Sequence, residues 1–406
     1  MNIILRKNGS KFAFLVFFCS LFLFFTPFEL SGSNPSMFPK YFVAGASLLL
    51  LAPLIFIKRI KLRAPSVLAL IVLITIVFHS TIISPVPAQF TLLIVANVLL
   101  AVFMYEASFN WRREFELAIY FILGINALVI AVQAMSFYLF TSEIFDFHKM
   151  IFGSPSRFVE DYLNIARFSG IQVEPGTYAN YMGCLLAILI LSSEFSEIML
   201  WVWFVGIISI FLTNSGSAVY FVPVLIILLT FIGRRKIRPF HLLVLSLAIV
   251  LYMHFSGVLA HLESRFLEHD DGSLSHRIEG INAYMTTTRL DKVFGVGFGA
   301  DPCVRCFYQD IGVIFNLLTR GGIIVAMALS LLLIRSIMMN GILLSMILFL
   351  IPLNEKMYFY EAPIWVFILF AATGVRNAKQ GMPVQASSSS SFQRSMKGMA
   401  ELDDYA

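Results

Sequence analysis

Apolar residues in this chain occur in long runs that are separated by short polar segments. The runs do not alternate at every second residue, as the strands of a membrane β-barrel would. A membrane-spanning helix needs about 20 apolar residues, and several runs reach or approach that length. The pattern predicts an all-α polytopic membrane protein with about twelve transmembrane helices, at 12–30, 41–57, 66–83, 88–105, 115–140, 177–193, 198–213, 217–232, 240–257, 310–334, 337–351 and about 357–373.

Composition supports the membrane assignment. Of the 406 residues 59% are hydrophobic and 13% are charged, and soluble domains carry about 25% charged residues. The same composition excludes disordered, collagen-like, coiled-coil and disulfide-scaffold proteins. The net charge is +5. In membrane proteins basic residues are concentrated in cytoplasmic loops, where they contact anionic lipid headgroups. Membrane lipid is therefore an expected partner, and nucleic acid is not.

The distribution of Lys and Arg predicts the orientation. With a cytoplasmic N-terminus most basic residues fall in cytoplasmic segments, and the short outer loops hold only Lys40 and Lys356, which fits the positive-inside rule. No A-x-A-like cleavage site follows the first run, so we expect a retained span there. We therefore expect one transmembrane domain over 1–376, two long outer loops at about 141–176 and 258–309, and a disordered cytoplasmic tail over 377–406.

The first long loop ends in a segment with candidate anion chemistry, running from Arg167 through Gly170 to Glu174 and Pro175. Pro175 suits the first position of a helix, which places Glu174 near its cap. The free N–H groups of that helix end and the Arg167 cation favour a phosphate or diphosphate, with Glu174 ionised. The structural alternative is a capped helix with an Arg–Glu ion pair.

The second long loop contains a basic cluster followed by glycines. Such glycines bring the backbone close to a bulky ligand or turn the chain. The formal G-x-G-x-x-A match is not read as a dinucleotide site, because Asp301-Pro302 follows where a helix is required. The candidate base is His276, and the candidate binding residues are Arg277, Arg289, Gly295 and Gly297.

The tenth predicted span begins at Asp310, which is a candidate general base or a helix cap. Arg320 follows about 15 Å further along the helix, where an arginine is costly and is either functional or half of an ion pair. Cys303 and Cys306 lack two further zinc ligands, so no metal site is expected and a local disulfide is favoured. Three amides in the spans are expected to hydrogen-bond between helices: Asn97, Asn126 and Gln133.

Four short motifs occur in a fixed order. They are Arg167-x-x-Gly170-x-x-x-Glu174-Pro175, Ser215-Gly216-Ser217, Arg277 ahead of Gly295-x-Gly297-x-Gly299, and Gly321-Gly322-Ile323. In this order, and with this placement in two outer loops, residues 140–335 resemble the O-antigen polymerase and O-antigen ligase superfamily.

The resemblance implies a metal-independent, inverting glycosyltransferase of the bacterial inner membrane that needs no cofactor. Its active site faces the periplasm, where the growing chain passes from undecaprenyl diphosphate to a new lipid-linked repeat unit. The implied partners are the undecaprenyl-diphosphate-linked oligosaccharide, a chain-length regulator and a flippase. On this interpretation arginines stabilise the diphosphate and a base activates the acceptor. The arginines are Arg167 and Arg277 with Arg289 in support, and the candidate bases are Glu174, Asp310 and His276.

Two alternatives stay open. An O-antigen ligase would transfer the glycan to lipid A–core, but ligases usually carry a histidine where this chain has Gln309-Asp310. The chain also departs from one polymerase pattern. Some polymerases have a glycine eleven residues after the arginine in each loop, and this chain has Tyr178 and Thr288 at those positions. A flippase or transporter would suit Arg320, but the concentration of charge in two long outer loops favours the enzyme.

Overall fold

The computed structural model describes residues 2–26, 38–57, 62–83, 88–141, 145–156, 166–193, 196–233, 247, 281–282, 284–286, 288–298, 312–353 and 358–374. Throughout these ranges the regular structure is helical, and they contain no β-strand. The predicted all-α class is therefore confirmed. The expected tail at 377–406, the span at 240–257 apart from Leu247, and most of the second outer loop lie outside the described residues.

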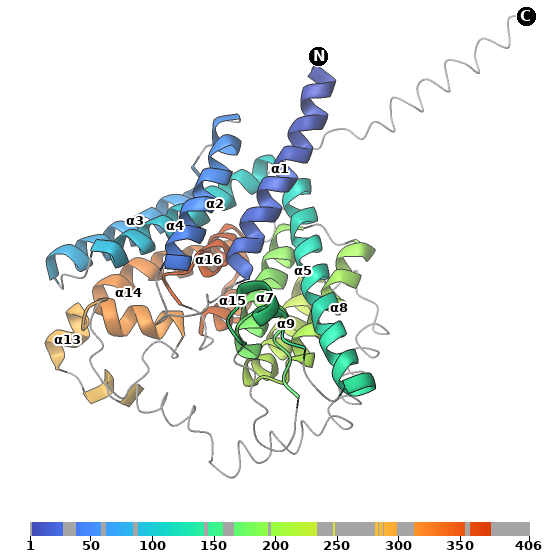
Figure 1. Ribbon diagram of the computed structural model, residues 1–406. Coiled ribbons are helices and arrows are strands. Elements are labelled where there is room, and N and C mark those ends of the chain that lie inside the picture. The colour runs from blue at the N-terminus through green and yellow to red at the C-terminus, as the bar shows by residue number, and fades with distance from the viewer. Residues whose placement is uncertain are drawn as a thin grey trace, which may run out of the picture.

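The helices follow one another along most of the chain, and Figure 1 shows their arrangement. They are α1 (Asn2–Phe25), α2 (Phe38–Ile57), α3 (Ala64–Phe78), η1 (His79–Ile83), α4 (Ala88–Asn110), α5 (Arg112–Met135), η2 (Ser136–Thr141), α6 (Phe147–Phe152), α7 (Pro175–Ser192), α8 (Glu197–Leu212), α9 (Gly216–Gly233), α13 (Arg289–Phe294), α14 (Val313–Asn340), α15 (Ile342–Leu350), η4 (Ile351–Leu353) and α16 (Ala362–Thr373).

Six helical segments are long and apolar enough to cross a membrane. They are Ala64–Ile83, Ala88–Asn110, Arg112–Phe140, Pro175–Ser192, Gly216–Gly233 and Val313–Asn340. Five shorter apolar helices accompany them in the described part of the chain. The protein is thus a helical membrane protein, and the full set of about twelve spans with both termini inside stays a prediction.

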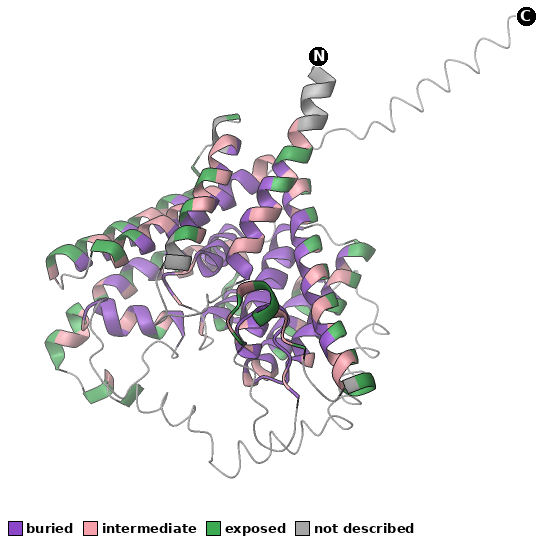
Figure 2. Ribbon diagram, viewed as in Figure 1, coloured by how far each residue is buried: buried purple, intermediate pink, exposed green. Residues whose placement is uncertain are grey.

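Two helices form the centre of the molecule. Nearly all of α7 is buried, and every residue of α16 is buried. Figure 2 shows this buried centre surrounded by helices with exposed outer faces. Helix α16 packs against α4, α7 and α14. A helix that is apolar on all sides is typical of such a central position.

Helices α7 and α16 run parallel, with a large axial offset. The Cys184 thiol lies 3.6 Å from the carbonyl oxygen of Pro363, and the Tyr181 hydroxyl donates to the carboxylate of Glu361 three residues earlier on α7. Cys184 is the tenth residue of α7, whereas Pro363 is the second residue of α16. The two positions differ by eight residues. At 1.5 Å per residue, the start of α16 is therefore offset from the start of α7 by about 12 Å along the helix axis.

The end of the chain differs from the expected pair of spans at 337–351 and 357–373. Helix α14 continues to Asn340, and Gly341, whose φ is 82°, separates it from an α15 of only 9 residues. Helix α16 has 12 residues, about 18 Å, which is shorter than the roughly 30 Å hydrocarbon core. The physical reason is that Asn340-Gly341 interrupts the apolar run, and the positive φ of Gly341 ends the helix there.

Candidate functional site

Residues 166–174, which we call the α7 approach segment, lead into the central helix. The Gly170 N–H donates to Gln133 Oε1 over 2.8 Å, and Gln133 Nε2 donates to the Phe145 carbonyl over 2.7 Å. Gly170 has a φ of +64°, and a Cβ there would lie 3.2 Å from the ring of Tyr178. The segment is therefore held against α5 and α7 by bonds that a side chain at residue 170 would disturb.

Two further amides hold the same segment. Gln172 Nε2 donates to the Phe25 carbonyl over 2.9 Å, and Asn214 Nδ2 donates to the Ala166 carbonyl over 2.7 Å. Gln133 bonds non-helical segments at Phe145 and Gly170, and not another helix as expected. The side-chain nitrogens of Asn97 and Asn126 instead donate within their own helices.

Glu174 lies where the sequence predicts, at the N-cap of α7 with Pro175 as the first helical residue. Its backbone is extended, and its carboxylate does not cap its own helix. Glu174 and Arg167 are half-buried, although the segment between them is buried. The structure therefore leaves these two charged residues at the edge of a buried segment, beside an electropositive helix end.

The second motif region docks onto α14. Residues 288–298, which we call the motif loop, comprise the short helix α13 and the residues that follow it, and α13 lies beside α14 (Figure 1). The Val296 N–H donates to the Thr319 carbonyl over 3.0 Å, and the Gly297 N–H donates to the Arg320 carbonyl over 2.9 Å. The loop thus pairs with the helix backbone.

This pairing occurs where α14 is interrupted. Gly322 has φ 63° and ψ −166°, so it is not helical. A non-helical residue breaks the regular pattern of bonds from each N–H to the carbonyl four residues earlier. The motif loop supplies N–H groups to the carbonyls that precede the break, which satisfies them without water.

Arg320 is 7% exposed, and its Nη1 donates to the Phe298 carbonyl over 2.9 Å. The sequence did not decide whether Arg320 forms an ion pair or has a functional role. One partner is a backbone carbonyl of the motif loop, so Arg320 holds this loop on α14. Its expected role in binding substrate stays a prediction.

His79 contacts the same loop and was not singled out by sequence reasoning. Its ring is fully buried at the start of η1, and Nε2 donates to the Phe294 carbonyl. The ring also packs edge-to-face on Phe298, with centroids 5.2 Å apart. A histidine inside an apolar run was the available signal, because polar residues within spans are costly.

Glu361 was missed as well. It is the N-cap of α16, and Pro363 stands at the second helical position. It is half-buried, whereas every residue of the helix that follows is buried. The available signal was Glu361-Ala-Pro363 ahead of an apolar run, which repeats the helix-start chemistry of Glu174-Pro175.

The other candidates are distributed as follows. Arg289 is exposed at the start of α13. Among the described residues no three His, Cys, Asp or Glu side chains are grouped as metal ligands. The remaining candidates lie outside the described residues: His276, Arg277, Asp310, and the cysteines Cys303 and Cys306.

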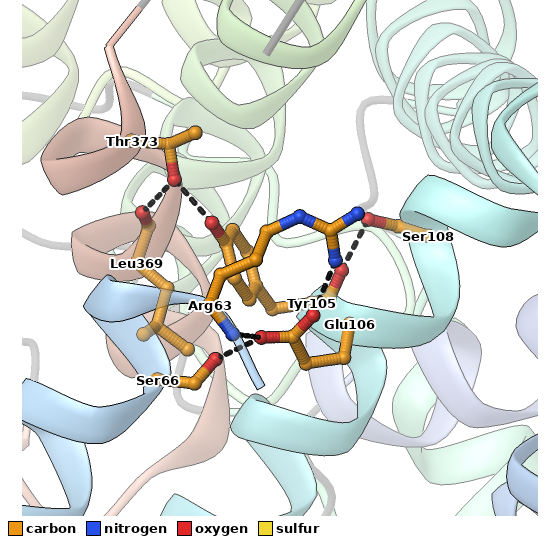
Figure 3. Close-up of polar contacts among 7 residues, drawn as sticks. All are labelled: Arg63, Ser66, Tyr105, Glu106, Ser108, Leu369 and Thr373. Carbon is orange, nitrogen blue, oxygen red and sulfur yellow. Dashed lines mark hydrogen bonds and ion pairs between the residues drawn. The ribbon is translucent and has the colours of Figure 1, made fainter. Parts of the chain in front are cut away.

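A second polar cluster lies at the opposite end of α16 (Figure 3). Glu106 is fully buried and pairs with the Arg63 guanidinium. Its carboxylate also accepts the Arg63 N–H over 2.7 Å and the Ser66 hydroxyl over 2.5 Å. Next to it, the Tyr105 and Thr373 hydroxyls are hydrogen-bonded, which connects α4 to the end of α16. A carboxylate occupied by this many donors is typical of a structural ion pair.

Comparisons with known proteins add no assignment. No family model matches this chain, and a search of the curated proteins finds no match.

Proposed function

We propose that this chain is a polymerase of lipid-linked oligosaccharide repeat units for an O-antigen or related surface polysaccharide. It acts at the periplasmic face of the bacterial inner membrane. It transfers the growing chain from undecaprenyl diphosphate to a new lipid-linked repeat unit, without a metal or cofactor.

One observation carries the proposal. The glycines of the motif loop and the Gly321-Gly322 pair of α14 are separate in sequence and are packed together in space. They meet beside Arg320, which bonds the loop. An anchored loop next to a membrane span suits an enzyme whose substrate has a lipid end in the bilayer and a sugar end in water.

The chemistry requires charge stabilisation on one side and a base on the other. Negative charge builds on the diphosphate as the C1–O bond breaks, and fixed arginines stabilise it in place of a metal. Arg167 and Arg277 have this role, and Arg289 supports them. The acceptor hydroxyl is activated from the opposite side by a carboxylate or imidazole, for which the candidates at the loops are Glu174, Asp310 and His276.

The test is deletion of the gene in its host, followed by electrophoresis of the surface polysaccharide. We expect loss of the long-chain ladder while core plus one repeat unit remains. Wild-type chain should restore the ladder, and Arg167→Ala should not. An unchanged ladder after deletion would refute a role in this polysaccharide.

A second candidate is a lipid-linked oligosaccharide flippase or transporter, because discontinuous helices such as α14 and intramembrane polar residues are typical of transporters. A flippase deletion removes even the single-unit band and traps the lipid-linked unit in the inner leaflet. An O-antigen ligase deletion also removes that band but leaves polymerised, lipid-linked chains in the outer leaflet.

A further inference from the structure

Glu361 lies at the start of α16, beside the central helix α7. The Tyr181 hydroxyl donates to the Glu361 carboxylate, and the Tyr181 ring contacts Phe25, the last residue of α1. Phe90, the third residue of the spanning helix α4, packs against Tyr360, so Glu361 lies level with the first turn of α4. An ionisable residue at the end of a membrane-spanning segment is a candidate for a functional role.

The Glu361 carboxylate is oriented by a neighbouring helix and not by its own. It makes no side-chain cap bond to α16, and Tyr181, which is 4% exposed, donates to its Oε2. Glu361 is half-buried, whereas every residue of α16 is buried. The free N–H groups of the helix end stabilise its negative charge.

A second polar side chain lies on the same side of α7. Asn180 is fully buried, and neither its Oδ1 nor its Nδ2 has a hydrogen-bond partner among the described residues. It lies one helical turn before Cys184, which contacts Pro363 of α16, so it is level with the start of α16. A buried amide costs free energy unless it is bonded, and a hydroxyl-rich ligand supplies both donors and acceptors.

The same helix start is connected to the motif loop. Phe359, two residues before Glu361, packs against Phe298 with ring centroids 5.2 Å apart. Arg320 donates to the carbonyl of Phe298. The start of α16 therefore lies between α7 and the loop that carries the glycine motif, and not at the far side of the molecule.

We propose that Glu361 is a catalytic general base that binds and deprotonates the acceptor hydroxyl, with Tyr181 as its positioning residue. This inference rests on the proposed function. The acceptor oxygen forms a bond to C1 of the donor sugar while the C1–O bond to the diphosphate breaks. The electron pair of that bond leaves with undecaprenyl diphosphate, and the hydroxyl proton moves to the Glu361 carboxylate.

The test is polymerisation by the purified full-length protein in liposomes, with the undecaprenyl-diphosphate-linked repeat unit as substrate. General bases contribute about 10²–10⁴-fold, so Glu361→Gln should lower kcat by about 10²-fold or more, with KM changed less than about threefold. Tyr181→Phe should lower kcat by a smaller factor at the same KM. Glu197→Gln is the matched control, because Glu197 is an exposed carboxylate at another helix start.

Chemical rescue distinguishes a base from a structural residue. Formate should restore part of the activity of Glu361→Ala and leave wild type and Glu197→Ala unchanged. A Glu361→Gln protein with the wild-type unfolding temperature and a kcat within about threefold of wild type would overturn the proposal. If Glu361→Gln does not fold, a wild-type kcat in Tyr181→Phe together with no formate rescue would overturn it. Failure of the wild-type protein to polymerise refutes the proposed function itself, whatever Glu361 does.

Discussion

Gly295 and Gly322 pack backbone against backbone, although one lies in the motif loop and the other inside the helix α14. A Cβ on Gly295 would lie 2.2 Å from the Arg320 carbonyl oxygen, and a Cβ on Gly322 would lie 2.3 Å from the Val293 carbonyl oxygen. Both residues also have positive φ. Each position therefore excludes side chains twice, by backbone conformation and by space.

Alanine at either glycine should undock the motif loop. Strained backbone costs about 1–3 kcal/mol, and the overlap with a carbonyl adds to it, so for Gly295→Ala and Gly322→Ala we expect chain extension to fall by about tenfold or more. Polysaccharide ladders of complemented deletion strains measure this. Gly341→Ala is the control, because Gly341 also has positive φ but a Cβ there would meet nothing within 4 Å. Equal loss in all three variants would mean that φ strain, and not close packing, is the cause.

Removal of the His79 hydrogen bond should loosen the motif loop. In His79→Phe the Phe294 carbonyl loses its donor, and an unsatisfied buried group costs about 1–3 kcal/mol. We expect faster amide hydrogen exchange in residues 288–298, measured by mass spectrometry. His148→Phe is the control, since His148 is also buried but bonds the nearby Ser154 carbonyl. Unchanged exchange in His79→Phe would show that the glycine contacts hold the loop by themselves.

Arg320→Ala should separate chain extension from transport. The substitution removes the bond to the Phe298 carbonyl and a buried cation, so we expect the ladder to be lost while lipid-linked single units still reach the outer leaflet. Leaflet-specific labelling of the lipid-linked unit measures this. Arg113→Ala is the control, because Arg113 is exposed. Accumulation of single units in the inner leaflet would favour the flippase.

The Arg63–Glu106 pair should contribute mainly to stability. Loss of one partner of a fully buried ion pair costs about 3–5 kcal/mol. Because Glu106 is fully buried but Arg63 is 33% exposed, we expect a smaller cost and a clear fall in the unfolding temperature of purified Glu106→Gln protein. Glu116→Gln provides the comparison, because the Glu116 side chain is 20% exposed and pairs with Arg112 four residues earlier on the same helix, where about 0.3–0.5 kcal/mol is typical. Thermal unfolding in one detergent measures both, and similar shifts would contradict the structural role of Glu106.

Several elements of the fold were predictable from local signals. Pro175 predicted the start of α7, and the apolar runs predicted most helices within a few residues. The break at Gly341 was missed, although Asn340-Gly341 is a turn dipeptide that could have indicated it. The roles of His79 and Glu361 were also missed, since each depends on a residue far away in sequence, Phe294 and Tyr181 respectively.

The sequence by itself determined that the chain is an all-α membrane protein. The length and composition of apolar runs are local properties, and a bilayer accepts an apolar run of sufficient length as a helix. It also identified Arg320 and the glycines as unusual residues. Only the tertiary structure decided that Gly295 packs on Gly322, that Arg320 bonds the motif loop, and that Glu361 of α16 bonds Tyr181 of α7. Those relationships depend on axial offset and on contacts between distant segments, which no local pattern of residues specifies.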